Sequence, residues 1–181
     1  MIRDFSVTPK AKNNNAKLLM CLFFVISLIS LVVALFVDRY KGVVGMVTLA
    51  SLTTAILVYT KYVAVVFHYD VRAEGEEEPL FIVRQTVGKR NVTLCRVALA
   101  GIVSVVKETK AERRAHKSTS GVVRYYYMPT IAAPESYRIS VSSRYEKAEI
   151  NVEISDEFAQ MLTSLAKEAK EMRAEADEDE D

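Results

Sequence analysis

The sequence predicts a membrane α-helical hairpin followed by an α+β, mainly β, domain that ends in an amphipathic helix. Two apolar segments, residues 18–37 and 42–60, contain no charged residue, and about 20 such residues cross the hydrocarbon core of a bilayer. Beyond residue 62, apolar and polar residues alternate in short segments, which is typical of strands. Near the C-terminus, Phe158, Met161, Leu162 and Leu165 follow the i, i+3, i+4, i+7 spacing of an amphipathic helix.

The N-terminal third is expected to consist of a disordered segment, residues 1–16, and a two-span hairpin, residues 17–61. The first apolar run is longer than the core of a secretory signal, and no A-x-A cleavage site follows it, so we expect an uncleaved helix. Basic residues concentrate outside the short connecting turn, which predicts a multi-pass protein of the cell membrane with both termini cytoplasmic. The flanking basic residues are Arg3, Lys10, Lys12, Lys17, Lys61 and Arg72, against Arg39 and Lys41 in the turn.

Small and hydroxyl residues recur on one face of each apolar segment and are the expected contact surface between two membrane helices. They are Ser27, Ser30 and Ala34 in the first segment and Ser51 and Thr54 in the second. A polar path or an oligomer contact is the functional alternative. Packing within the hairpin is favoured, because neither segment contains the Asp, Glu, Lys, Arg or His that marks a transport route.

The soluble domain is expected over residues 62–173, with seven strands and one C-terminal helix. The strands are expected at residues 63–71, 80–87, 91–98, 102–107, 122–128, 137–142 and 148–154. Gly88 suits a tight hairpin turn, because glycine tolerates positive φ. Ser155 is the expected N-cap of the helix. Residues 107–120 are expected to form a charged loop, and residues 174–181 an acidic, disordered tail.

Two stretches resemble a known protein family: residues 81–90 (FIVRQTVGKR) and residues 94–106 (LCRVALAGIVSVV). With the order of helices and strands, they make the chain similar to small bacterial membrane proteins with two N-terminal transmembrane helices followed by a pleckstrin-homology-like (PH-like) domain. The resemblance implies a bent, seven-stranded antiparallel sandwich capped by the C-terminal helix. It implies no phosphoinositide pocket, because Arg84 lacks the second arginine of that motif and residues 74–78 are acidic.

The strongest candidate site is a group of basic residues in and around the charged loop. Clusters of Lys and Arg near the cytoplasmic leaflet can bind anionic lipid, so lipid or partner binding is the functional interpretation, and a solvated loop is the alternative. The candidates are Lys107, Lys110, Arg113, Arg114, Lys117 and Arg124, with His116 among them.

The composition and motifs favour a non-enzymatic protein without a cofactor or metal. The chain has 24 Lys+Arg against 23 Asp+Glu, which does not indicate nucleic-acid binding. It contains no G-x-S-x-G, HExxH, P-loop or GxGxxG motif, and Cys21 and Cys95 are not expected to form a disulfide. We therefore expect a membrane-anchored PH-like interaction module that binds a protein partner, another copy of itself or anionic lipid headgroups. The alternative is an accessory subunit of a membrane transport or envelope-maintenance complex, in which the hairpin is the working part.

Overall fold

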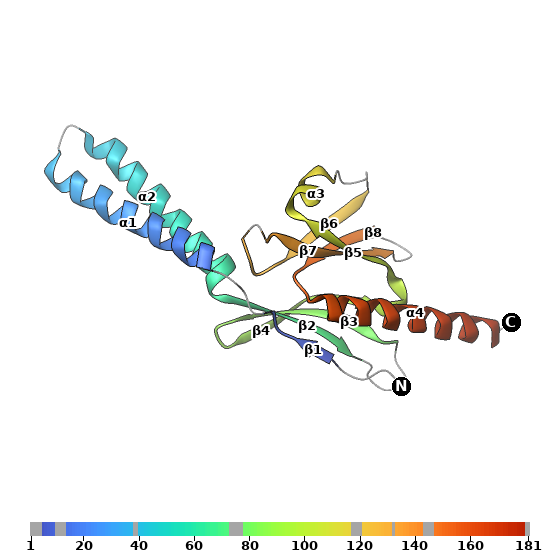
Figure 1. Cartoon of the computed structure of the whole chain (residues 1–181). Coiled ribbons are helices and arrows are strands. Elements are labelled where there is room, and N and C mark those ends of the chain that lie inside the picture. The colour runs from blue at the N-terminus through green and yellow to red at the C-terminus, as the bar shows by residue number, and fades with distance from the viewer. Residues whose placement is uncertain are drawn as a thin grey trace. The chain divides into compact units, whose positions relative to one another are not determined.

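A computed structural model describes residues 5–9, 14–37, 40–72, 78–116, 121–131, 133–142 and 147–179. The chain divides into two compact units, residues 11–65 and residues 1–10 together with 66–181. The first unit is the helical hairpin. The second contains two four-stranded sheets and the C-terminal helix (Figure 1).

The hairpin consists of α1 (Asn14–Phe36) and α2 (Lys41–Val58), and α2 continues as a π-helical turn, η2 (Tyr59–Val63). Both helices are long and apolar enough to cross a membrane, as predicted. The helical region ends three residues later than the expected boundary at residue 60. The strand expected from residue 63 starts at Val65, because the Ala64 N–H donates to the Tyr59 carbonyl at 2.9 Å and closes one more helical turn.

The first sheet, sheet A, has the strand order β1-β2-β3-β4. Its strands are β1 (Phe5–Val7), β2 (Val65–Arg72), β3 (Leu80–Val87) and β4 (Arg90–Ala98). Gly88, with a φ of +60°, makes the expected turn between β3 and β4. The expectation that residues 1–16 are disordered is wrong for β1, in which Ser6 pairs with Asp70 of β2. Three residues carry too little periodicity to reveal a strand that depends on its partner.

The second sheet, sheet B, has the strand order β5-β7-β8-β6. Its strands are β5 (Ile102–Thr109), β6 (Val122–Tyr127), β7 (Glu135–Ser142) and β8 (Lys147–Val152), and β6 runs parallel to β8. The described residues therefore form two sheets of four strands, whereas a seven-stranded antiparallel sandwich was predicted. Alternation along β6 identifies a strand, but it contains no information about the direction or identity of the strand beside it.

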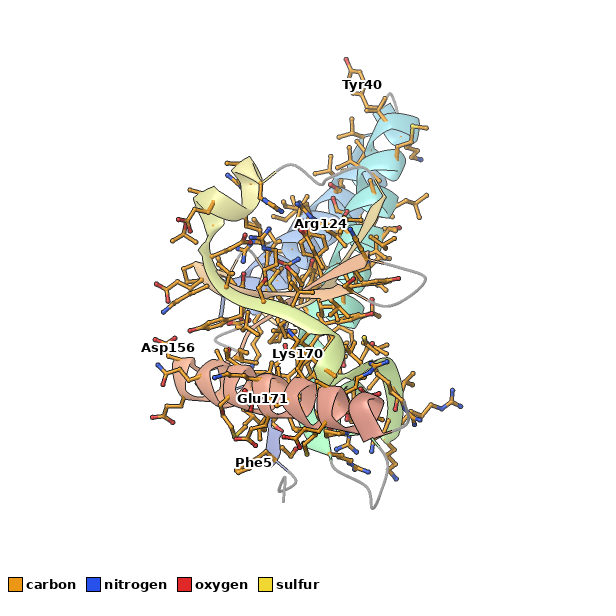
Figure 2. The ribbon with its side chains drawn as sticks, turned by 90° about the vertical axis from the view of Figure 1, so that its right-hand side faces the viewer. Phe5, Tyr40, Arg124, Asp156, Lys170 and Glu171 are labelled. Atoms are coloured by element: carbon orange, nitrogen blue, oxygen red, sulfur yellow. The ribbon has the colours of Figure 1, made fainter. Side chains whose placement is uncertain are left out.

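Helices lie where the sequence suggested a loop and a tail. The short helix α3 (Lys110–Ala115) falls in the expected charged loop, and a capping box between Thr109 and Glu112 starts it. The helix α4 (Asp156–Asp179) begins as predicted, with the Phe158 N–H donating to Ser155 Oγ at 3.2 Å. It extends to Asp179, so the expectation of disorder from residue 174 is wrong there. Figure 2 shows Asp156 at the first turn of α4.

The core of the sheet domain lies between the two sheets and under α4. Tyr69 connects the sheets, because its buried hydroxyl donates to the Tyr127 carbonyl at 2.5 Å and accepts from the Glu153 N–H at 3.3 Å. Burial raises the pKa of Tyr69, so the hydroxyl keeps its proton. The other fully buried large side chains include Phe81, Leu99, Ile102, Ile139, Ile150 and Leu162. Leu162 confirms the predicted apolar face of the C-terminal helix.

Candidate functional site

Three of the predicted basic residues are engaged within the sheet domain. Lys107 Nζ lies 2.9 Å from Glu135 Oε2 and 3.1 Å from Asp156 Oδ1, and these hydrogen bonds raise its pKa. Arg113 donates to the Ser136 hydroxyl and, at 2.5 Å, to the Ala133 carbonyl.

The third of these residues, Arg124, pairs with a carboxylate in sheet B, and the remaining basic residues are more open. Arg124 Nε lies 2.7 Å from Glu149 Oε2. Lys110 is half-buried and Arg114 is exposed, and neither forms an ion pair with any residue that the structure describes. Lys117 lies outside the described residues. The predicted group is therefore not one free basic surface, because about half of its charge is matched inside the domain.

Arg124 belongs to an ion network on sheet B that the sequence did not reveal. Glu149, whose side chain is 10% exposed, also approaches Arg138 Nη1 at 3.4 Å and His116 Nε2 at 3.1 Å. Arg138 in turn lies 3.0 Å from Glu108. Figure 2 marks Arg124 in the layer formed by sheet B. The network joins all four strands of sheet B to the end of α3. In the sequence, the network is visible only as charged residues within predicted strands. They can be recognised as a network only when the register of β6 and β8, which places Arg124 opposite Glu149, is known.

The network favours the charged form of Glu149. Burial alone raises the pKa of this carboxyl group, but hydrogen bonds from His116 and Arg124 outweigh it, and the pKa lies below its usual value. A carboxylate held by several cations is a structural acceptor rather than a proton donor at neutral pH. The arrangement therefore supports a rigid outer face on sheet B.

A cleft of about 600 Å³ opens on the inner side of sheet B, next to β4. Tyr125 and Tyr127 line it and stack with ring centroids 5.9 Å apart and an interplanar angle of 15°. Their position agrees with strand alternation, which places these two tyrosines on one face. The other lining residues are Leu94, Cys95, Arg96, Val97, Ala98, Gly101, Val141, Ser142, Ala148, Ile150 and Arg173. Burial raises the pKa of the Cys95 thiol, and the thiol therefore behaves mainly as an apolar group in this wall.

The small residues predicted for helix packing are partly buried inside the hairpin. Ser27 and Ser51 are 6% and 7% exposed, and the Ser27 hydroxyl donates across to the Thr48 carbonyl of α2 at 3.3 Å. Ser30, Ala34 and Thr54 are half-buried. The Thr54 hydroxyl bonds back to Ala50 of its own helix at 2.8 Å. These contacts agree with packing of α1 on α2.

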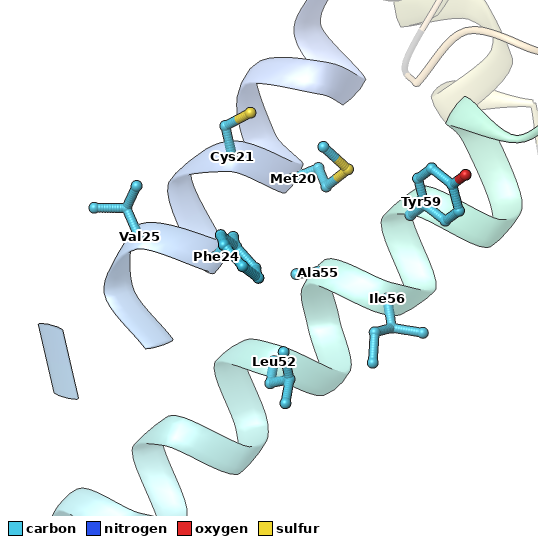
Figure 3. Close-up of a pocket in the computed structure, with 8 residues that line it drawn as sticks. All are labelled: Met20, Cys21, Phe24, Val25, Leu52, Ala55, Ile56 and Tyr59. Atoms are coloured by element: carbon cyan, nitrogen blue, oxygen red, sulfur yellow. The ribbon is translucent and has the colours of Figure 1, made fainter. Parts of the chain in front are cut away.

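An apolar groove of about 400 Å³ lies along the hairpin. Figure 3 shows Phe24 of α1 and Ala55 of α2 between the two helices. The groove is also lined by Met20, Cys21, Val25, Leu52, Ile56 and Tyr59. In a bilayer, such a surface is suited to contact with lipid chains.

Among the described residues, no group of three or more His, Cys, Asp or Glu side chains could hold a metal ion. Among the features that the structure describes in the sheet domain, the ion network on sheet B and the cleft beside β4 are the two candidates for a site. No family model, no curated protein and no solved structure matches this chain.

Proposed function

We propose that this chain is a membrane-anchored, non-enzymatic interaction module whose sheet domain binds a protein partner at the cytoplasmic face. The cleft beside β4 carries the proposal. Ligand-binding clefts typically span about 300–1,000 Å³ and combine apolar and aromatic walls with a few polar groups, and this cleft has that composition and size. The two helices of membrane length would keep such a binding surface near the bilayer.

A protein partner is favoured over anionic lipid. Lys107, Arg113 and Arg124 already have internal partners, and freeing them for lipid would break those contacts. Lipid binding would therefore depend on Lys110, Arg114 and Lys117, fewer than the four to eight basic residues of a typical lipid-binding cluster.

We also propose that the sheet domain is related to PH-like domains. This relationship concerns only the general architecture of the domain. A sheet-rich domain that ends in a long helix supports it. The parallel pairing of β6 with β8 does not fit an antiparallel meander. We therefore transfer no ligand site from that family.

The pairing of β1 with β2 supports a specific topology. The hairpin lies between these strands in the sequence, yet Val7 pairs with Tyr69 in one sheet. If α1 crosses the membrane, α2 must return the chain to the same side. We expect tags placed before Met1 and after Asp181 to be protected together in sealed cells and exposed together in inverted vesicles. Tags on opposite sides would contradict the proposal.

Binding itself is testable by photo-crosslinking from the full chain in its native membrane. A photoreactive residue at position 125, 103 or 172 would sample the cleft, β5 or α4, because Tyr125, Val103 and Met172 are all exposed. We expect discrete adducts to other proteins from position 125. The absence of adducts from all three positions would count against an interaction module.

The apolar groove favours the alternative, an accessory subunit of a membrane complex in which the hairpin is the working part. One substitution distinguishes this alternative from the first proposal. Ser51→Leu introduces a large side chain at a position 7% exposed and is expected to weaken helix packing by about 1–3 kcal/mol. An interaction module should retain its adducts from position 125, whereas a hairpin-based subunit should lose its assembly. Thr53→Leu, at an exposed position of the same helix, is the matched control.

A further inference from the structure

The free edge of β4 forms one wall of the cleft. Five consecutive residues, 94–98, line it. Successive side chains of a strand point to opposite faces, so a surface that reaches all five follows the strand edge rather than one face. Within the described part of the chain, β4 is the last strand of sheet A and pairs only with β3. Its outer row of backbone N–H and C=O groups is therefore available to another strand.

An edge strand of sheet B also contributes to the wall of the cleft. β6 is the last strand of sheet B in the described structure, and Tyr125 and Tyr127 on β6 line the cleft. A bulge in β4 adds to the opening: Val83 pairs with Cys95 and Arg84 with Thr93, which leaves Leu94 without a cross-strand partner. Bulges redirect side chains and bend the strand, and here the bulged residue is part of the wall.

The charged groups in the wall have one sign. Arg96 and Arg173 line the cleft, and its lining includes no Asp or Glu from the part of the chain that the structure describes. Arg96 is exposed. Arg173 contacts Glu78 at 3.5 Å, but both side chains remain about half exposed. A ligand with carboxylates beside its apolar groups would match this lining better than a basic or neutral ligand.

From these observations we propose that the cleft binds an extended, acidic segment of a partner protein, which adds as a strand to the free edge of β4. The inference rests on the proposed function and specifies its site and ligand. Backbone hydrogen bonds to β4 would supply affinity, and alternate side chains would enter the apolar wall formed by Leu94, Val97 and Ile150. Carboxylates on the other positions would meet Arg96 and Arg173. The five residues of β4 that line the cleft span about 16 Å, at 3.3 Å per residue. An extended segment of about the same number of residues would therefore match the length of this edge.

The test uses the full chain with Cys21→Ser, held in nanodiscs of zwitterionic lipid. The probe is a fluorescent peptide of alternating glutamate and valine, and its binding is followed by anisotropy. We expect binding that weakens with salt, and slower maleimide labelling of Cys95, which is then the only cysteine and lines the cleft. A lysine–valine peptide of the same length should not bind. A glutamate–valine peptide with N-methyl groups on consecutive residues should also fail, because it lacks the backbone N–H donors of both edges and cannot pair with a strand.

Two variants locate the site. Arg96→Glu should weaken binding at least about tenfold, since it replaces an attractive charge by a repulsive one. Arg90→Glu makes the same charge change on the same strand outside the cleft and should retain most of the affinity. Equal effects of the two variants, unchanged binding of the N-methylated peptide, or binding without protection of Cys95 would each overturn the inference.

The outcomes also separate this inference from the proposed function. Photo-adducts from position 103 or 172 without peptide binding would leave an interaction module that uses another surface, and the cleft inference would fail alone. No photo-adducts and no peptide binding would remove both. Adducts between two copies of this chain at position 125 would identify the occupant as a second copy and overturn the assignment to a partner protein.

Discussion

Glu149→Ala is expected to destabilise the sheet domain by about 3 kcal/mol. Removing one partner of a buried ion pair costs about 3–5 kcal/mol, because the remaining charge is left without compensation. The lower end applies here, since Arg124 and Arg138 keep 16% and 18% of their side-chain surface exposed. Urea unfolding of the full chain in nanodiscs, followed by near-ultraviolet circular dichroism of its tyrosines, measures the loss.

Glu135→Gln is the matched control for this prediction. Glu135 also forms an ion pair, with Lys107, but its side chain is 59% exposed, and exposed pairs contribute about 0–1 kcal/mol. If Glu149→Ala and Glu135→Gln lowered the free energy of unfolding by similar amounts, the network on sheet B would contribute no more stability than an exposed ion pair.

The contribution of Glu149 should also depend on pH. Its pKa in the folded protein is below the usual value, so the unfolded chain binds a proton more readily. The stabilisation is therefore complete above the unfolded pKa of about 4.3 and is lost as the pH falls through the lower folded pKa. The stability difference between wild type and Glu149→Gln should shrink between pH 5 and pH 3. A difference that stayed constant or grew over this interval would contradict the assigned charge state.

Phe81→Ala is expected to destabilise the sheet domain by about 3–5 kcal/mol, the usual cost of truncating a buried aromatic side chain. Phe81 is 0% exposed on β3, and its strand partner Val97 is part of the wall of the cleft. The cavity left by the ring should therefore reduce peptide binding as well as stability. The same urea titration and the anisotropy assay measure the two effects.

Val87→Ala is the control on the same strand. Val87 is 42% exposed, so its truncation should cost well under half as much. A small effect of Phe81→Ala, comparable with that of Val87→Ala, would mean that the inner face of sheet A does not form the core of the domain.

Local patterns in the sequence were sufficient to predict the helices whose formation depends on nearby residues. The uncharged segments predict α1 and α2, Ser155 predicts the start of α4, and Leu162 predicts its buried face, because each depends on composition or on spacing along one helix. The π-helical turn at Tyr59–Val63 was missed, since Val63 and Val65 also fit a strand. The six-residue helix α3 was missed because its capping box, at Thr109 and Glu112, was hidden in a segment that looked simply charged.

Features that depend on contacts between distant residues could not be predicted from one sequence. The parallel neighbour of β6 and the partner of β1 are chosen by the tertiary structure. The same limitation affects the candidate site. Lys107 and Arg124 look like free cations in the sequence, and only the pairing of strands brings Glu135, Asp156 and Glu149 beside them. The cleft lies between the edge of β4 and the inner face of sheet B, which are far apart in the sequence.

The short strand β1 has a consequence for the biogenesis of the protein. It is synthesised before both helices, but its partner β2 follows them. During translation, sheet A cannot close until the ribosome has delivered the second helix and Val65–Arg72. If the hairpin spans a bilayer as we propose, both of its helices would have to be inserted before β1 and β2 could meet on one side and complete sheet A. A chain whose second span failed to insert would leave β1 and β2 on opposite sides of the membrane, so completion of the sheet would report correct insertion.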